Sequence, residues 1–189
     1  RSVHFKDTDG RETKLVSRRL VHMKFPHLAA IEWELVPLNW SGEIEILSAL
    51  DGTVTNSGVE RYSDLEGRHL QPLKTGKLND SNILLVVQSS QSKITMAQAA
   101  RSKLFVNGEE LKTAPEIVVK EGYIAQHFHN KAEKSRVIRI EKTVALFTSR
   151  DNAISEPELE AGNALKQAGD FESLLKSHQL AWKQLWYRC

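Results

Sequence analysis

Apolar and polar residues alternate along most of the chain, from residue 2 to residue 147. A period of two is typical of strands that bury one face. In the stretch HLAAIEWELVP, Trp33 and its apolar neighbours at positions 31 and 35 are expected on the buried face. Glu32 and Glu34 are expected on the solvated face. The stretch EIEIL repeats the alternation, with Glu43 and Glu45 predicted to face solvent.

The short segment NWSG separates these two alternating runs. Asn39 and Gly42 tolerate positive φ and close turns at low steric cost. We therefore expect the two runs to pair as an antiparallel hairpin. Further turns are predicted at Asp9-Gly10, Asp51-Gly52, Asn107-Gly108 and Glu121-Gly122.

The spacing of the turns leaves almost no room for crossover helices before residue 150. Residues 1–150 are therefore predicted to form an antiparallel β-sandwich or barrel. The apolar runs at 82–88 and 135–150 indicate more deeply buried strands. The polar, glycine-containing segment 56–81 is predicted to be a long loop over the sheet, and long loops in compact domains often carry function.

The period changes after Arg150. Ser155 and Pro157 are suited to the start of a helix and Gly169 to its end. A second helix is predicted from Asp170, with one apolar stripe at helical spacing that comprises Phe171, Leu174, Leu175, His178, Ala181, Trp182, Leu185 and Trp186. Two arrangements remain open for its last turns: they pack back on the sandwich, or they dock onto a domain beyond Cys189.

Composition restricts the classes of partner. The chain has 26 Lys plus Arg against 24 Asp plus Glu, and this formal charge of +2 indicates neither nucleic acid nor an anionic membrane surface. No stretch approaches the roughly 18 consecutive apolar residues of a membrane span. The single cysteine, Cys189, allows no internal disulfide, which favours the cytoplasm. Without an initiator Met, and ending within an amphipathic pattern, the sequence is expected to be a piece of a longer chain.

His127 and His129 are the first candidates for chemistry, because residues i and i+2 of a strand share a face and can offer two imidazoles to a metal ion. No acidic or cysteine residue near them in the sequence completes a ligand set. We therefore predict a pair of surface or partly packed histidines rather than a metal site, and assign no metal ligand and no cofactor site.

Carboxylates could also provide a general acid and base. The pairs Glu43 with Glu45 and Glu32 with Glu34 alternate with apolar residues, however, and are predicted to be solvated surface. Cys189 has no neighbour that would lower its pKa, and no G-x-S-x-G motif is present. We assign no catalytic residue.

The predicted long loop contains side chains that could bind a sugar hydroxyl or a phosphate: Arg61, Tyr62, Arg68 and His69. The simpler interpretation is that they hold the loop on the sheet by hydrogen bonds and stacking.

Three segments together resemble a known family: SRRLVHMKFPHLAAIEWELVPLNWSGEIEILSALDGTVTN, the GVERY...GRHL stretch, and the ending FESLLKSHQLAWKQLWYRC. They are similar to the N-terminal domain of glycoside hydrolase family 65, whose members include maltose, kojibiose, nigerose and trehalose phosphorylases and some hydrolases. The resemblance covers about Ser17 to the end of the chain.

The resemblance implies a mainly β fold, an antiparallel β super-sandwich like that of galactose mutarotase, followed by linker helices over 151–189 that lead to a catalytic (α/α)6 barrel. The barrel carries the general acid Glu and the phosphate-binding residues, so no catalytic residue is carried over to this chain. Family members usually have further strands before the point where this chain begins, so some strand edges here are expected either to lack partners or to pair with a separate part of the molecule. The implied partners are the protein's own catalytic domain, a second subunit in a homodimer, and a disaccharide, with inorganic phosphate as co-substrate of a phosphorylase.

Three functions are weighed. The first is the noncatalytic N-terminal domain of a family 65 phosphorylase or hydrolase. The second is a carbohydrate-binding module in which an exposed aromatic such as Trp40 stacks on a sugar ring. The third is a mutarotase-like enzyme, for which the sequence offers no assignable set of His and Glu residues.

Overall fold

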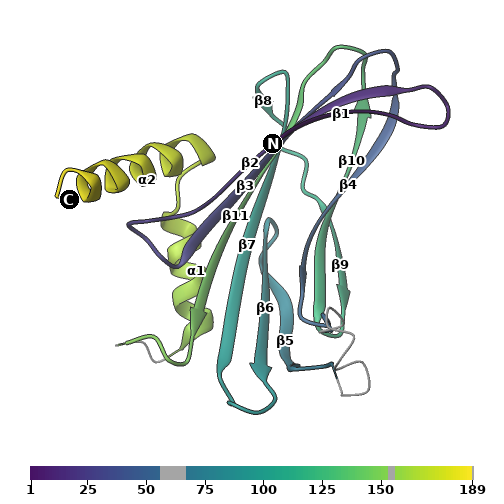
Figure 1. Ribbon diagram of the computed structural model, residues 1–189. Coiled ribbons are helices and arrows are strands. Elements are labelled where there is room, and N and C mark those ends of the chain that lie inside the picture. Colours follow the sequence, from purple (N-terminus) through teal and green to yellow (C-terminus); the bar gives the residue numbers. More distant parts are fainter. Residues whose placement is uncertain (56–66, 153–155, 189) are drawn as a thin grey trace.

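A computed structural model describes residues 1–55, 67–152 and 156–188 (Figure 1). The strands are β1 (Ser2–Lys6), β2 (Glu12–Val21), β3 (Leu28–Pro37), β4 (Gly42–Asp51), β5 (Leu70–Asn79), β6 (Asn82–Ser89), β7 (Thr95–Val106), β8 (Glu109–Glu110), β9 (Glu116–Lys120), β10 (Tyr123–Ala132) and β11 (Ile138–Thr148). The helices are α1 (Pro157–Gln167) and α2 (Phe171–Trp186). None of the described helices is long and apolar enough to cross a membrane.

The strands form two sheets, and every pairing is antiparallel, as predicted for this span. The large sheet has the order β1-β2-β3-β11-β7-β6-β5, with β8 paired to β7, and the small sheet has the order β4-β10-β9. The small sheet packs on one face of the large sheet, near β5, β6 and β7, while α1 packs on the other face against β7 and β11 (Figure 1). A β-sandwich with a helical layer results.

Strand β6 lies between the edge strand β5 and β7, and its uninterrupted apolar run has a structural reason. Ile83 and Leu85 point into the core between the sheets, while Leu84 and Val86 point into the core beneath the helices. Both faces are covered, so alternation disappears. The predicted buried strand at 82–88 is confirmed.

The turn at residues 39–42 does not close a hairpin, and the predicted pairing of its flanking strands is wrong. β3 lies in the large sheet between β2 and β11, while β4 pairs with β10 in the small sheet. Asn39 accepts a hydrogen bond from the Glu12 backbone N–H and donates to the Gly10 carbonyl, which ties the turn to the large sheet. Trp40 packs between the sheets and donates to Thr13 Oγ1 at 2.9 Å. The chain therefore switches sheets here.

Three of the predicted turns rest on backbone with positive φ, at Gly10, at Asn107-Gly108 and at Gly122. At Gly52, φ is not in that region, and close packing explains the residue instead. A Cβ there would lie 2.5 Å from Val87 Cγ1, so a side chain could not fit without a shift of the core.

The predicted long loop is wrong over residues 70–79, which form the edge strand β5. Its side chains are mostly exposed, and its pairing with β6 is irregular at Pro72 and near Lys77. Proline, lysine and bulges are typical of edge strands, where they discourage further pairing. The polar composition of the segment therefore reflects an edge position. Residues 56–66 lie outside the described part of the chain.

The helices begin and end close to the predicted residues. α1 starts at Pro157 and is followed by Gly169, as expected; Ser155 lies outside the described residues. Asp170 caps α2 and accepts a hydrogen bond from the Ser173 backbone N–H at 2.9 Å. The Ser173 hydroxyl and then this backbone bond lower the Asp170 pKa. At the junction, Arg101 on β7 donates to the Ala168 and Gly169 carbonyls and so holds the helical segment on the sheet.

Candidate functional site

The two predicted surface histidines belong to a cluster on the outer face of the small sheet. β10 pairs with β4 on one side and with β9 on the other. In this register His129 lies opposite Glu45 and His127 lies opposite Glu116. Side chains of directly paired residues project on the same side of a sheet. One strand therefore provides two imidazoles, and each neighbouring strand provides one carboxylate.

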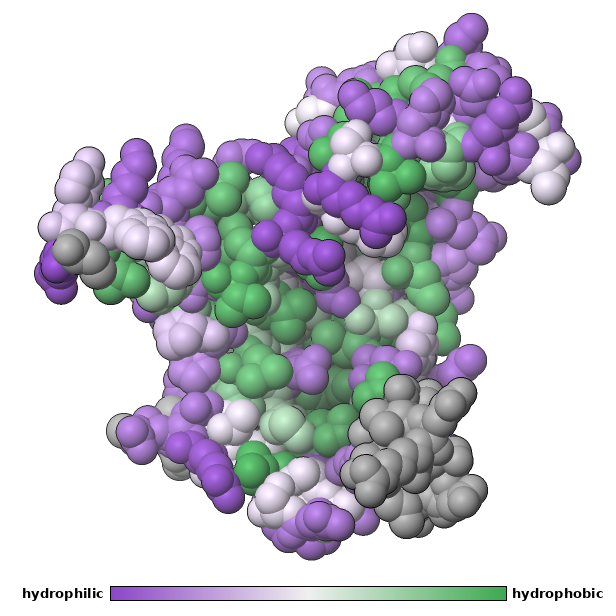
Figure 2. Space-filling model, in the orientation of Figure 1, coloured by the Kyte–Doolittle hydropathy of each residue, from purple (hydrophilic) through white to green (hydrophobic). Residues whose placement is uncertain are grey.

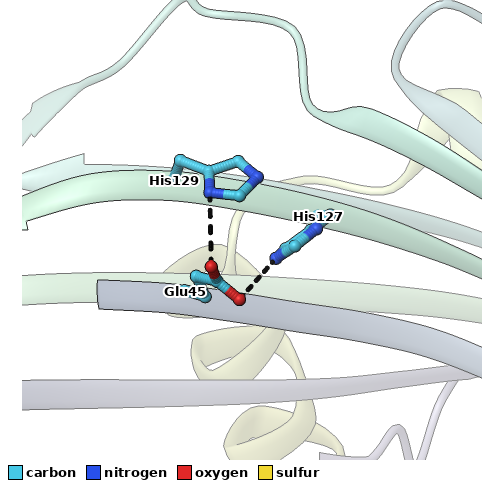
Figure 3. A group of neighbouring side chains, drawn as sticks. All are labelled: Glu45, His127 and His129. Carbon is cyan, nitrogen blue, oxygen red and sulfur yellow. Dashed lines mark ion pairs between the residues drawn. The ribbon is translucent and has the colours of Figure 1, made fainter. Parts of the chain in front are cut away.

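The Glu45 carboxylate faces both imidazoles, with one ion pair to each (Figure 3). Its Oε2 is 3.3 Å from His127 Nε2 and its Oε1 is 3.9 Å from His129 Nδ1. On the other side of His129, Nε2 is 3.7 Å from Glu116 Oε2. The two rings are 4.1 Å apart between centroids. Because the His129 and both Glu side chains are more than half exposed, solvent and ions can reach the cluster.

No acidic residue next to the histidines in the sequence completes a ligand set, as predicted, but strand pairing brings Glu45 and Glu116 beside them in space. Glu45 is far from His127 in sequence, and only the pairing of β4 with β10 brings them together. The HFH pattern supplies half of the cluster. The other half depends on strand register, which alternation alone does not define.

The prediction that Glu32 faces solvent is wrong, since only 1% of the residue is exposed. It lies on the face of the large sheet near α2 and forms ion pairs with Arg18 at 2.6 Å and with Arg139 at 3.2 Å. Arg18 also pairs with Glu172 in the first turn of α2. Paired charges satisfy one another, which allows a carboxylate to be buried here.

Arg18 links this cluster to the helix in a second way, because its guanidinium lies 4.8 Å from the centre of the buried Phe171 ring. Burial lowers the Arg18 pKa, but its hydrogen bonds to Glu172 and Glu32 outweigh burial and raise the pKa. Arg18 is therefore a permanent cation between sheet and helix. The cluster anchors α2 and offers no acid and base pair with an open face.

The other predicted candidates lie apart from these clusters. Glu43 is on the solvated face of β4, as expected. Arg68 and His69 are exposed and border a surface cavity beside Glu121. Arg61, Tyr62 and Cys189 lie outside the described residues.

The apolar stripe of α2 is divided in two. Phe171 and Leu174 are buried against the large sheet. Further along, Trp182 is 38% exposed, Trp186 is 70% exposed and the adjacent Tyr187 is 89% exposed. The helix projects away from the sandwich at its C-terminal end (Figure 1). The sandwich therefore covers the beginning of the stripe and leaves the aromatic end accessible.

A second accessible apolar surface is a groove between β3 and β4, where the small sheet stops short of the large one. Ile31, Trp33 and Leu47 line it, and Trp33 is 47% exposed. This is opposite to the prediction that Trp33 is core, because among the described strands β4 is the edge of the small sheet. Figure 2 shows apolar residues gathered in the middle of this face, between the helices and the small sheet.

A charged residue lies in the same groove. Lys142 on β11 donates from Nζ to the Ala49 carbonyl, and burial lowers the pKa of its ammonium to about 8. Trp40, the proposed sugar platform, is half-buried between the sheets with its indole N–H bonded to Thr13. Its ring is therefore a core contact.

The described residues thus define a β-sandwich domain whose clusters of charge mainly join its own elements and whose apolar side chains are exposed in two places. Such a domain is suited to contacts with other protein surfaces. The chain belongs to glycosyl hydrolase family 65, because the description "Glycosyl hydrolase family 65, N-terminal domain" matches residues 1–185.

Similar proteins agree with this membership. A glycosyl hydrolase of Mycobacterium tuberculosis (strain H37Rv) is 34% identical over 189 residues, which is 100% of this chain and 14% of that protein. A kojibiose phosphorylase of Halothermothrix orenii is 26% identical over 196 residues, covering 99% of this chain and 24% of that protein. An α,α-trehalose phosphorylase of Thermoanaerobacter brockii is 25% identical, and the match covers 98% of this chain and 24% of that protein.

Among solved structures, a putative kojibiose phosphorylase from the human microbiome has the same fold, with a TM-score of 0.76, 15% identity, and coverage of 94% of this chain and 22% of that chain. The chain thus spans between 14% and 24% of the lengths of these proteins.

Proposed function

We propose that this chain is the noncatalytic N-terminal domain of a disaccharide phosphorylase or hydrolase of family 65, and that it scaffolds the catalytic (α/α)6 barrel. The observation that carries the proposal is the family match over residues 1–185 in a chain that spans at most 24% of its phosphorylase relatives. The parent reaction is inverting attack of phosphate, or water, on an α-glucosidic disaccharide. Its general acid and its phosphate site belong to the barrel.

The two accessible apolar surfaces support a scaffolding role. Residues 1–150 form the sandwich, and residues 151–189 are the linker toward the barrel. Trp182, Trp186 and Tyr187 at the end of α2 provide the contact with the barrel, since large aromatics are the side chains that interfaces bury. We further propose that strands of the parent protein pair with the edge of β4 that none of the described strands occupies, and cover Trp33. The parent enzyme is proposed to be a cytoplasmic homodimer. The mass of the full-length protein in solution tests whether it is a dimer.

Activity assays test the noncatalytic role. The 189-residue chain, purified to homogeneity, is expected to release no glucose 1-phosphate and no glucose from kojibiose, trehalose or maltose, with or without phosphate. Full-length protein should turn over one of these sugars. Turnover by the short chain that a point substitution within residues 1–189 abolishes would refute the proposal.

Calorimetry separates scaffolding from sugar binding. Titration of the chain with the same disaccharides is expected to give no saturable heat, because the indole of Trp40 packs between the sheets. Saturable binding that Trp33→Ala removes would identify a carbohydrate-binding module, with the groove beside β4 as its site.

A further inference from the structure

We infer that Glu45, His127 and His129 bind a divalent transition-metal ion of the zinc type on the outer face of the small sheet, with Glu116 as the carboxylate that orients His129. Imidazole nitrogens and carboxylate oxygens are ligands that zinc accepts together. The proposed function assigns no role to these four residues, and the inference does not depend on it.

The spacing of the ligand atoms supports a metal site. Zinc is bound by His N and Glu O at about 2.0 to 2.2 Å, so atoms at neighbouring corners of its tetrahedron are about 3.3 Å apart. Glu45 Oε2 and His127 Nε2 are already separated by 3.3 Å, and Glu45 Oε1 and His129 Nδ1 by 3.9 Å. The three side chains each present a ligand atom within 4.8 Å of the others. Small side-chain rotations therefore suffice to bring the three ligand atoms around one ion, and water can take the fourth position.

The surroundings of the second ring nitrogen of His129 also support a metal site. A metal-bound histidine usually donates its other ring N–H to a carboxylate or carbonyl, which fixes the tautomer and the ring plane. Glu116 Oε2 lies 3.7 Å from His129 Nε2, on the side of the ring away from Glu45. A proton on Nε2 directed at Glu116 leaves the Nδ1 lone pair directed at Glu45 and the ion.

The backbone holds these residues in place. His127 and His129 share one face of β10, and both carboxylates stand directly opposite them on hydrogen-bonded neighbours. An ion would connect β4 and β10 directly and reach the short edge strand β9 through Glu116. Binding should therefore stabilise the small sheet as well as occupy the cluster.

Isothermal titration with zinc tests the inference on protein without a polyhistidine tag and stripped with EDTA. We expect one zinc ion per chain and no saturable heat with Mg²⁺, a hard cation that prefers oxygen ligands. At free zinc a hundredfold above Kd, the melting temperature should rise by roughly 5 to 10 °C. Amide exchange of residues 116–120 in β9 should slow on binding.

Substitutions locate the ion. His127→Gln, His129→Gln and Glu45→Gln should each abolish saturable binding, whereas Glu116→Gln should weaken it about 10- to 100-fold. The matched control is His4→Gln, which removes a single exposed imidazole that lies 3.5 Å from a carboxylate on another strand, and it should leave zinc binding unchanged. The substituted side chains are exposed except for that of His127, which is partly buried, and circular dichroism verifies the fold of each variant.

Two results would overturn the inference: wild-type chain that shows no saturable zinc binding, or zinc binding that both His127→Gln and His129→Gln leave unchanged. Neither result bears on the absence of phosphorolysis or on the contact of α2 with the barrel, so the proposed function is tested separately.

Discussion

Arg18 on β2 and Glu32 on β3 form an ion pair of 2.6 Å in which the glutamate is almost completely buried. Their side chains project from neighbouring strands toward the start of α2, where Glu172 gives Arg18 a second carboxylate. The face of the large sheet that carries Glu32 is predicted from alternation to be solvated, but α2 packs against it. The first half of α2 belongs to the sandwich for this reason.

Replacing Glu32 with alanine should destabilise the chain by about 3 kcal/mol, because Arg18 and Arg139 would then lack the buried carboxylate between them. Urea denaturation followed by far-UV circular dichroism measures the loss. Glu43→Ala is the matched control on a solvated strand face and should change stability by less than about 0.5 kcal/mol. Equal effects of the two substitutions would contradict the role given to Glu32.

Acid should weaken the attachment of α2 through His22. This imidazole is buried, with Nδ1 accepting from the Lys24 and Phe25 backbone N–H groups and Nε2–H donating to Ser177 Oγ at 2.7 Å. Burial lowers the His22 pKa, and the nearby His178 and Lys24 lower it further, against one backbone hydrogen bond to Leu174 that raises it.

The unfolded chain therefore binds this proton at higher pH than the folded chain does. The stability contributed by neutral His22 is complete above about pH 6.5 and is lost as the pH falls from there through the lowered pKa. Urea midpoints at pH 7.5 and 5.0 should differ less in His22→Gln than in the wild type. A variant with the wild-type difference would show that other groups cause the acid loss.

Lys142 should destabilise the chain at neutral pH. Its pKa of about 8 lies below the ordinary value of 10.5, so the folded chain releases this proton first as the pH rises. The wild type should gain stability between about pH 8 and 10.5, relative to Lys142→Met. At pH 7 the methionine variant should be more stable by up to about 3 kcal/mol.

Thermal melts of both proteins from pH 7 to 10.5 measure this difference. The Lys142→Arg variant keeps its charge over the whole pH range, so its stability should not increase as the pH rises. A methionine variant that is less stable than the wild type at pH 7 would mean that the ammonium is favourable in the groove, through its bond to the Ala49 carbonyl.

Local chemistry makes some of this fold predictable from the sequence. Gly10, Gly108 and Gly122 mark turns because positive φ is required at the residue itself. The continuous apolar run of β6 predicts that both of its faces are buried, and Asp170, a residue type suited to capping, predicts the start of α2.

The remaining features depend on partners that are distant in sequence. Glu32 looks solvated until Arg18 and Arg139 are placed beside it, and the cluster of His127 with Glu45 requires the pairing of β4 with β10. The sheet switch at Asn39 likewise depends on contacts with β2 and on both edges of β3 being taken. Alternation specifies the faces of a strand, but not which face is covered or by what.

Replacing Trp182 and Trp186 together with serine should raise the solubility of the 189-residue chain and change its melting temperature by no more than about 2 °C. The reason is that the Trp182 ring neighbours Trp186 and His178 of the same helix, with centroids 6.3 and 6.4 Å away, while α2 is attached to the sheet through its first half. Leu174→Ala is the matched control at a buried position of the same helix and should cost about 2 to 5 kcal/mol. In the full-length protein the serine pair should lower the melting temperature, because burying a side chain of this class contributes roughly 1.5 to 3 kcal/mol that only the neighbouring domain can provide. If the short chain itself loses more than about 5 °C, the tryptophans pack on their own sandwich, and the aromatic end of α2 is not an interface.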